Sequence, residues 1–77
     1  MQLITTQKYE NAKGLATAQI FVTDGNDVWV VLDMHEKIGN ARRMMIHNGQ
    51  SANRQFYAKD VMYGLILADI HFNEVFG

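Results

Sequence analysis

The chain has 77 residues, with seven Lys or Arg, eight Asp or Glu, and no cysteine or proline. This length supports a single domain over residues 1–77 with one thin core, and the lack of cysteine excludes disulfide or Cys–metal support for that core. An apolar content of 48% and a net charge of -1 argue against disorder. Because the core is thin and unsupported, we expect the protein to self-associate or to bind a partner.

No targeting or membrane-spanning segment is recognisable in the sequence. The N-terminus lacks the basic and apolar regions of a signal peptide. No apolar run approaches the roughly 18 residues that a membrane-spanning helix requires. We therefore expect a cytoplasmic protein with no membrane partner, located in the host cytoplasm if the protein is viral.

The first quarter of the chain has the pattern of two strands joined by a turn. Residues 2–8 form the first expected strand, and residues 11–14 supply turn-forming Asn and Gly before the second. A helix over residues 5–17 is the alternative, although Gly14 inside it would weaken it. The strand interpretation is therefore preferred.

A β-hairpin is the clearest local signal in the sequence. Residues 18–24 and 28–33 are rich in β-branched and aromatic types, and the Gly-Asn-Asp sequence at 25–27 tolerates the positive φ of a tight loop. A two-residue loop would place Asp24 opposite Asp27, which is a repulsive pair. We therefore expect a three-residue loop at 25–27.

The expected register gives this hairpin two apolar faces. It pairs Val22 with Val30 and Ile20 with Leu32, which together form one aliphatic face. The opposite face then carries Phe21, Trp29 and Val31. Since both faces are apolar, both need to be covered.

The segment after the hairpin predicts a fourth strand and a loop. Residues 41–47 follow the turn signal at 39–40 and are expected to be extended, with a helix over residues 36–48 as the alternative. A polar loop follows at 48–51. Ser51 or Asn53 is then the candidate cap for the element that comes next.

The C-terminal segment predicts a helix from about Tyr57 to Phe72. One stripe of this helix is apolar at helical spacing and is expected to pack on the sheet. Its members are Tyr57, Ala58, Val61, Met62, Leu65, Ala68 and Phe72. Asp69 falls at the edge of the stripe, and Gly64 would permit close approach of another backbone.

Taken together, these elements predict the class of fold. We expect an α+β fold in which an antiparallel β-meander of three to four strands carries one C-terminal helix packed on one face.

The sequence contains no recognisable catalytic or cofactor-binding motif. Its six glycines form no phosphate-binding loop, and its single serine, Ser51, lacks the neighbouring glycines of a nucleophile elbow. The three histidines, His35, His47 and His71, match no metal-binding spacing. We therefore expect no enzymatic activity, no cofactor and no bound metal.

A basic segment between residues 37 and 59 is the first candidate binding surface. It contains five basic residues and no acidic residue. Four of them are candidate partner-binding residues: Arg42, Arg43, Arg54 and Lys59. Cations interleaved with aromatic residues suit either an acidic protein surface or nucleic acid, but a negative net charge is unusual for a nucleic-acid-binding domain.

A second apolar face of the expected helix is the other candidate binding surface. Tyr63, Leu67 and Ile70 follow i, i+4, i+7 spacing and lie opposite the core stripe. Exposed together, they would form a patch of the kind that marks an interface. The alternative is that an N-terminal segment or the tail at 75–76 folds over them.

In size and organisation the chain resembles the small single-domain proteins that phages encode to inhibit host machinery, anti-CRISPR proteins among them. The resemblance covers no motif and assigns no residue. It implies a protein without cofactors that acts by contact. The leading hypothesis is a non-enzymatic protein that occludes or bridges a protein or nucleoprotein partner, as a monomer or a homodimer. The alternative is a small nucleic-acid-binding protein or regulator that uses the basic segment.

Overall fold

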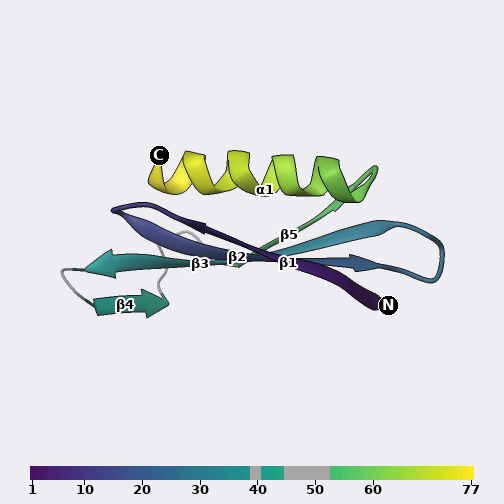
Figure 1. Ribbon diagram of the computed structural model, residues 1–77, viewed down its shortest axis with the longest axis horizontal. Helices are drawn as coiled ribbons and strands as arrows, with labels where there is room; N and C mark the ends of the chain where they lie inside the picture. Colours follow the sequence, from purple (N-terminus) through teal and green to yellow (C-terminus); the bar gives the residue numbers. More distant parts are fainter. Residues whose placement is uncertain (39–40, 45–52) are drawn as a thin grey trace.

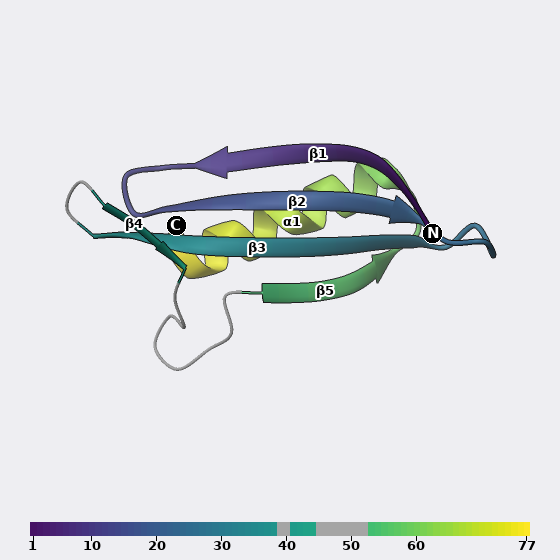
Figure 2. The same ribbon diagram turned by 90° about the horizontal axis from the view of Figure 1, so that it is seen from below.

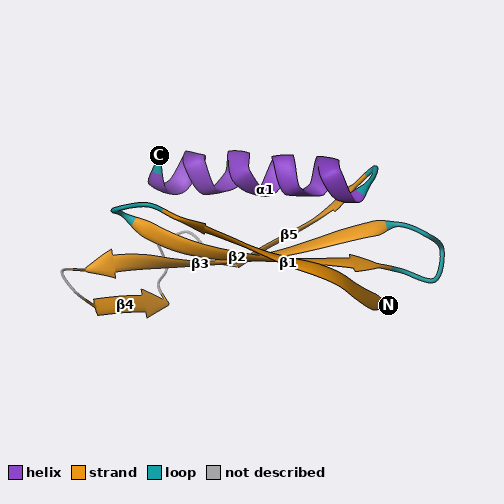
Figure 3. Ribbon diagram, in the orientation of Figure 1, coloured by secondary structure: helices purple, strands orange, loops and turns teal. Residues whose placement is uncertain are grey.

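The computed structural model describes residues 1–38, 41–44 and 53–77. The elements in chain order are β1 (Gln2–Glu10), β2 (Gly14–Val22), β3 (Val28–Ile38), β4 (Ala41–Met44), β5 (Asn53–Ala58) and α1 (Val61–Phe76) (Figure 1). Strands β1 to β4 form an antiparallel meander in sequence order, and α1 lies across one face of it. The predicted α+β fold is therefore confirmed, with the strands and the helix in two layers (Figure 3).

The outer edge of β3 is shared by two short strands. β4 pairs with residues 35–38 of β3, and β5 pairs with residues 28–33. Figure 2, which views the sheet from the side opposite α1, shows β5 alongside β3 and β4 crossing in front of the end of β3. The edge can hold both because β3 has 11 residues. β5 was not predicted, since part of it was assigned to the start of the helix.

The strand interpretation of the N-terminal segment is confirmed, and the alternative helix over residues 5–17 is wrong. β1 and β2 pair through a turn in which the Asn11 side chain accepts hydrogen bonds from two backbone N–H groups, those of Lys13 at 2.8 Å and Gly14 at 3.0 Å. A register shift between Leu3 and Thr5 marks a β-bulge in β1.

The β2–β3 hairpin has the predicted faces but not the predicted pairs. Val22 pairs with Val28 and Ile20 pairs with Val30, which is two residues away from the expected register. Successive side chains of a strand alternate between faces, so a shift by two residues leaves every side chain on the same face. The aliphatic face and the aromatic face of the hairpin are therefore as predicted.

The shifted register comes from the position of the loop. The loop has three residues as expected, but they are 24–26 instead of 25–27, because Thr23 and Asp27 close it. The backbone N–H of Thr23 donates to the Asp27 carbonyl at 2.9 Å, and the N–H of Asp27 donates to the Thr23 hydroxyl at 3.1 Å. Asn26 then takes the left-handed position that ends such loops, with φ of 66°.

The fourth predicted strand is confirmed for residues 41–44. In the β3–β4 register, Arg42 stands opposite Lys37 and Arg43 opposite Glu36. The rest of the predicted strand, residues 45–47, lies outside the described residues. So does the predicted loop at 48–51, which includes the candidate cap Ser51.

The helix begins and ends later than predicted. Tyr57 and the residue after it belong to β5, and Asp60 is the N-cap of α1, where its carboxylate accepts a hydrogen bond from the Tyr63 N–H at 2.7 Å. Asn53, the other candidate cap, instead opens β5. At the C-terminal end, the N–H of Gly77 donates to the Asn73 carbonyl at 2.8 Å. Asp60 therefore fixes where the chain changes from strand to helix.

The hydrophobic core lies between α1 and the even-numbered residues of β2 and β3. Its buried members are Ala16, Ala18, Ile20, Val28, Val30, Leu32, Met34, Ala68, Phe72 and Phe76. Gly64 permits close approach here, because a Cβ atom at this position would lie 3.0 Å from Cγ2 of Val30. The closest neighbours of Gly64 are thus the side chains of Val30, Ile20 and Ala58, which all belong to strands of the sheet, and not a second backbone as was predicted.

Polar contacts from β1 and the first turn also hold α1 on the sheet. The Tyr9 hydroxyl donates to the Leu65 carbonyl at 3.0 Å, and the Asn11 side-chain amide donates to the Phe76 carbonyl at 2.9 Å. The position of α1 is therefore set near its middle and at its end. At 16 residues, α1 falls short of a membrane span, and the described part of the chain contains no helix that could cross one.

Candidate protein-binding surface

The side of α1 that faces away from the sheet carries a continuous row of exposed apolar side chains. The buried line of the helix consists of Gly64, Ala68, Phe72 and Phe76. On the other side lie four residues that we call the α1 ridge: Met62 (73% exposed), Tyr63 (40%), Ile66 (48%) and Ile70 (50%). Ile66 is three positions from Tyr63 and four from both Met62 and Ile70, so it neighbours each of the other three side chains on the helix surface.

The rotation of α1 about its axis differs from the predicted one. Met62 was predicted in the core but belongs to the ridge, and Asp69 was predicted at the edge of the core but is exposed. Leu67 was predicted on the exposed face but is half-buried, whereas Tyr63 and Ile70 are exposed as predicted. Apolar residues surround the helix, and its buried line begins with a glycine and an alanine, so hydrophobic periodicity did not reveal which side faces the sheet.

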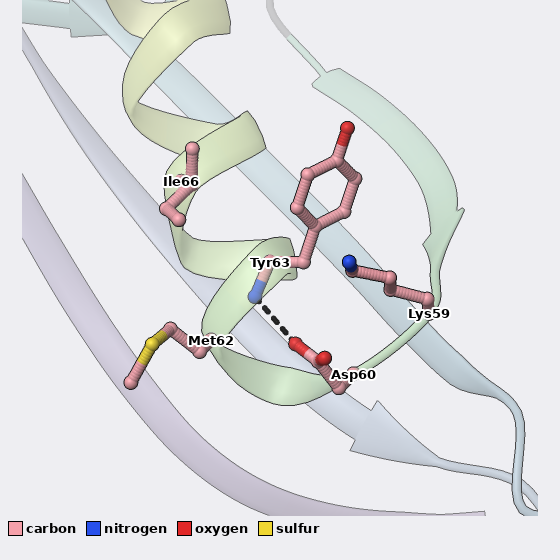
Figure 4. A pocket seen from close by; sticks show the side chains of 5 residues that line it. All are labelled: Lys59, Asp60, Met62, Tyr63 and Ile66. Carbon is pink, nitrogen blue, oxygen red and sulfur yellow. Dashed lines mark hydrogen bonds between the residues drawn. The ribbon is translucent and has the colours of Figure 1, made fainter.

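A shallow hollow lies at the N-terminal end of the ridge. It has a volume of about 170 Å³ and is lined by Lys59, Asp60, Met62, Tyr63 and Ile66 (Figure 4). The Lys59 ammonium lies 5.0 Å from the centre of the Tyr63 ring, within the range of a cation–π contact. The N-cap hydrogen bond of Asp60 fixes the backbone beneath this hollow. The hollow therefore has a largely apolar floor with one cation and one carboxylate at its rim.

The charges beside the ridge are acidic. Asp60, Asp69 and Glu74 are all exposed, and the sequence from residue 61 to residue 76 contains no Lys or Arg. Lys59, which is exposed, stands at the beginning of the ridge. A partner that covered the ridge would thus meet an apolar centre with carboxylates along its margins.

Arg54, a predicted partner-binding residue, makes side-chain contacts with other residues of the same chain. One of its guanidinium nitrogens lies 2.8 Å from Nδ1 of His71 and 3.3 Å from Oε1 of Glu74. The His71 ring also stacks on Phe56 of β5, with centroids 4.6 Å apart. Arg54 therefore connects β5 to the last turns of α1.

The remaining basic candidates do not form one surface. Arg42 and Arg43 pair with the end of β3 that contains Lys37, whereas Lys59 follows Ala58, which pairs with Val28 at the other end of β3. These ends are nine residues apart, or about 30 Å at roughly 3.3 Å per strand residue. Of the predicted binding residues, the structure brings together Lys59, Tyr63 and Ile70, and it separates them from Arg42 and Arg43.

Two members of the ridge, Met62 and Ile66, were missed by sequence reasoning. Met62 was assigned to the core, and Ile66 to neither stripe. The available signal was Asp69, because placing its carboxylate on the solvent side of the helix also places Met62 and Ile66 there, within roughly 60° of it at 100° per residue. The sequence predicted no metal site, and within residues 1–38, 41–44 and 53–77 the structure contains no group of three or more His, Asp or Glu side chains placed to hold an ion.

Comparison of the chain with protein-family models, with curated proteins and with solved structures gave no significant match. The function proposed below therefore rests on the residues of this chain and their geometry.

Proposed function

We propose that the protein is a non-enzymatic binding protein that docks the α1 ridge onto a partner protein. The observation that carries this proposal is the exposure of four large apolar side chains, from 40% to 73%, along one side of a helix whose opposite side is locked into the core. Contiguous exposed apolar surface of this kind is uncommon on proteins that act alone and is characteristic of interaction sites.

The ridge suits insertion into an apolar groove of the partner. Helices bound in this way present anchors at i, i+3, i+4 and i+7, and Tyr63, Ile66 and Ile70 have the i, i+3, i+7 spacing. Aromatic and long aliphatic anchors supply most of the binding energy in such interfaces. Because carboxylates flank the ridge, basic residues at the margins of the groove would complement it.

The same charges argue against nucleic acid as the ligand of this face. Phosphates would meet the exposed carboxylates of Asp60 and Asp69, while the cations that the described residues place nearby are Lys59 at the beginning of the ridge and Arg54, which is paired with Glu74. Binding by contact, without chemistry, is also the mode of action implied by the resemblance to phage-encoded inhibitors. The effect of docking is then to occlude the surface of the partner that receives the ridge.

The test is comparative capture from cells of the source, or of its host if the protein is viral. Wild type, Ile66→Asp and the control Ala12→Asp are immobilised, and captured proteins are quantified by mass spectrometry. Ala12 is exposed in the β1–β2 turn, away from the ridge, so the control adds the same charge elsewhere. A protein retained by wild type and control but lost with Ile66→Asp supports the proposal. Equal capture of every protein by all three baits contradicts it.

A further inference from the structure

The hollow at the beginning of the α1 ridge has the size of a single side chain. Its volume is about 170 Å³, and an apolar cavity of about 150 Å³ holds one benzene molecule. Met62 and Ile66 lie on one side of the hollow, the Tyr63 ring and Lys59 lie on the other, and Asp60 lies where the helix begins (Figure 4). One ring or one branched aliphatic group of a partner would therefore fill it.

Three of the lining side chains favour an aromatic ring over an aliphatic group. Tyr63 is 40% exposed, so part of its ring is accessible to a second ring. Met62 is 73% exposed, and a thioether sulfur makes favourable contacts with aromatic rings. The Lys59 ammonium lies at the rim, 5.0 Å from the centre of the Tyr63 ring, where it can also approach the face of an incoming ring. An aliphatic side chain would gain only the burial of its surface.

Asp60 adds a preference for a ring that carries a hydrogen-bond donor. Its Oδ1 accepts from the Tyr63 N–H at 2.7 Å, which holds the carboxylate beside the hollow. Its other oxygen, Oδ2, receives no hydrogen bond from the residues that the structure describes. A carboxylate is a strong acceptor for a hydroxyl or an indole N–H. Tyrosine and tryptophan combine a large apolar ring with such a donor, and both are enriched at protein interfaces.

We propose that the hollow receives a tyrosine or tryptophan side chain of the partner. The ring would lie against Tyr63, Met62 and Ile66, and its hydroxyl or indole N–H would donate to Oδ2 of Asp60. This inference rests on the proposed function, because it names the partner group that meets the N-terminal end of the α1 ridge. It also gives Asp60 two roles, as the N-cap of α1 and as the acceptor that recognises the partner.

The experiment titrates the full chain with 4-methylphenol, the side-chain analogue of tyrosine, and follows the backbone amide signals by NMR. The amides of residues 60–66 should shift in a saturable manner, with a dissociation constant of about 10 mM or lower. Two matched probes separate the contributions of the ring and the donor. 4-Methylcyclohexanol keeps the hydroxyl but lacks the aromatic ring, and 4-methylanisole keeps the ring but lacks the donor. Each should bind more weakly than 4-methylphenol, by about threefold or more.

Asp60→Asn tests the carboxylate without removing the helix cap, because Asn is also a strong N-cap residue. This variant should reduce the preference for 4-methylphenol over 4-methylanisole to less than about twofold. Asp69→Asn is the matched control, since it makes the same change in an exposed carboxylate of α1 that does not line the hollow. The control should leave the preference unchanged.

Three results would overturn the proposal. One is the absence of saturable binding of 4-methylphenol at residues 60–66. The second is binding of 4-methylphenol that is no tighter than that of either matched probe, and the third is equal behaviour of Asp60→Asn and Asp69→Asn. The titration contains no partner protein, so its failure overturns the occupant of the hollow even where the ridge captures a partner. Equal capture by all three baits overturns docking through the ridge even where 4-methylphenol binds.

Discussion

Gly14 of β2 lies directly against the ring of Phe76, the last residue of α1. A Cβ atom at Gly14 would stand 2.6 Å from the ring, and Phe76 is only 3% exposed. The absence of a side chain at residue 14 therefore makes room for the end of the helix, and this contact joins the beginning of β2 to the C-terminus of the chain.

Gly14→Ala should destabilise the protein, because the added methyl group forces the Phe76 ring out of its place in the core. Overpacking of this kind costs about 1–3 kcal/mol. Gly25→Ala is the matched control, since its nearest neighbour in the exposed loop is Asp27 at 3.8 Å, an ordinary contact distance. Urea denaturation of both variants checks the expectation, and equal midpoints for the two would contradict it.

Phe72→Ala and Met62→Ala test the rotation of α1. Phe72 is 4% exposed and packs between Tyr9 and Phe76, so its truncation should lower the free energy of unfolding by about 3–5 kcal/mol. Met62 is 73% exposed, and its truncation should change that free energy by less than about 0.5 kcal/mol. If both variants lost the same stability, the ridge would be part of the core.

The Tyr9 hydroxyl should make stability depend on pH in the alkaline range. Burial, with the Asp69 carboxylate nearby, raises the pKa of Tyr9 above its ordinary value. The folded state then holds this proton more tightly than the unfolded state. The resulting stabilisation is complete below about pH 10 and is lost as pH rises through the raised pKa.

Tyr9→Phe should remove this alkaline dependence as well as the hydrogen bond to the Leu65 carbonyl, which is worth about 0.5–1.5 kcal/mol. Thermal melts of wild type and variant at neutral pH and above pH 10 measure both effects. The difference between the two proteins should shrink as pH rises. A difference that stayed constant or grew would show that the hydroxyl is not the group responsible.

Reversing the charge of β4 separates protein binding from the nucleic-acid alternative. Arg42→Glu combined with Arg43→Glu should leave partner binding by the α1 ridge unchanged, because β4 pairs with the end of β3 far from Lys59. Wild type should also lack DNA or RNA binding of the kind that weakens steeply with salt. Affinity for nucleic acid that falls steeply with salt and disappears in the double variant would instead favour the basic segment as the functional surface.

Local sequence signals were sufficient for most of the sheet. Turn residues such as Asn11 and the β-branched runs of β2 and β3 act within a few positions, so strands and faces could be predicted from them. The register could not, because Thr23 and Asp27 close the loop through a contact that composition does not reveal. β5 was hidden for a similar reason: Tyr57 and Ala58, which belong to β5, fit the helical spacing of the segment that follows.

The binding surface could be predicted only in part. Tyr63 and Ile70 were identified by their spacing, but Met62 and Ile66 depend on how α1 is rotated against the sheet. That rotation is set by tertiary contacts at Gly64 and at the Tyr9 hydroxyl, which no pattern within the helix encodes.

The most direct test of the α1 ridge as a binding surface is the affinity of Ile66→Asp for the captured partner, measured by titration calorimetry. A central anchor of an interface contributes about 2 kcal/mol or more, so the dissociation constant should rise by about 30-fold or more. The free energy of unfolding of the unbound protein should stay close to that of wild type, because Ile66 is 48% exposed. A dissociation constant equal to that of wild type would show that the partner binds elsewhere.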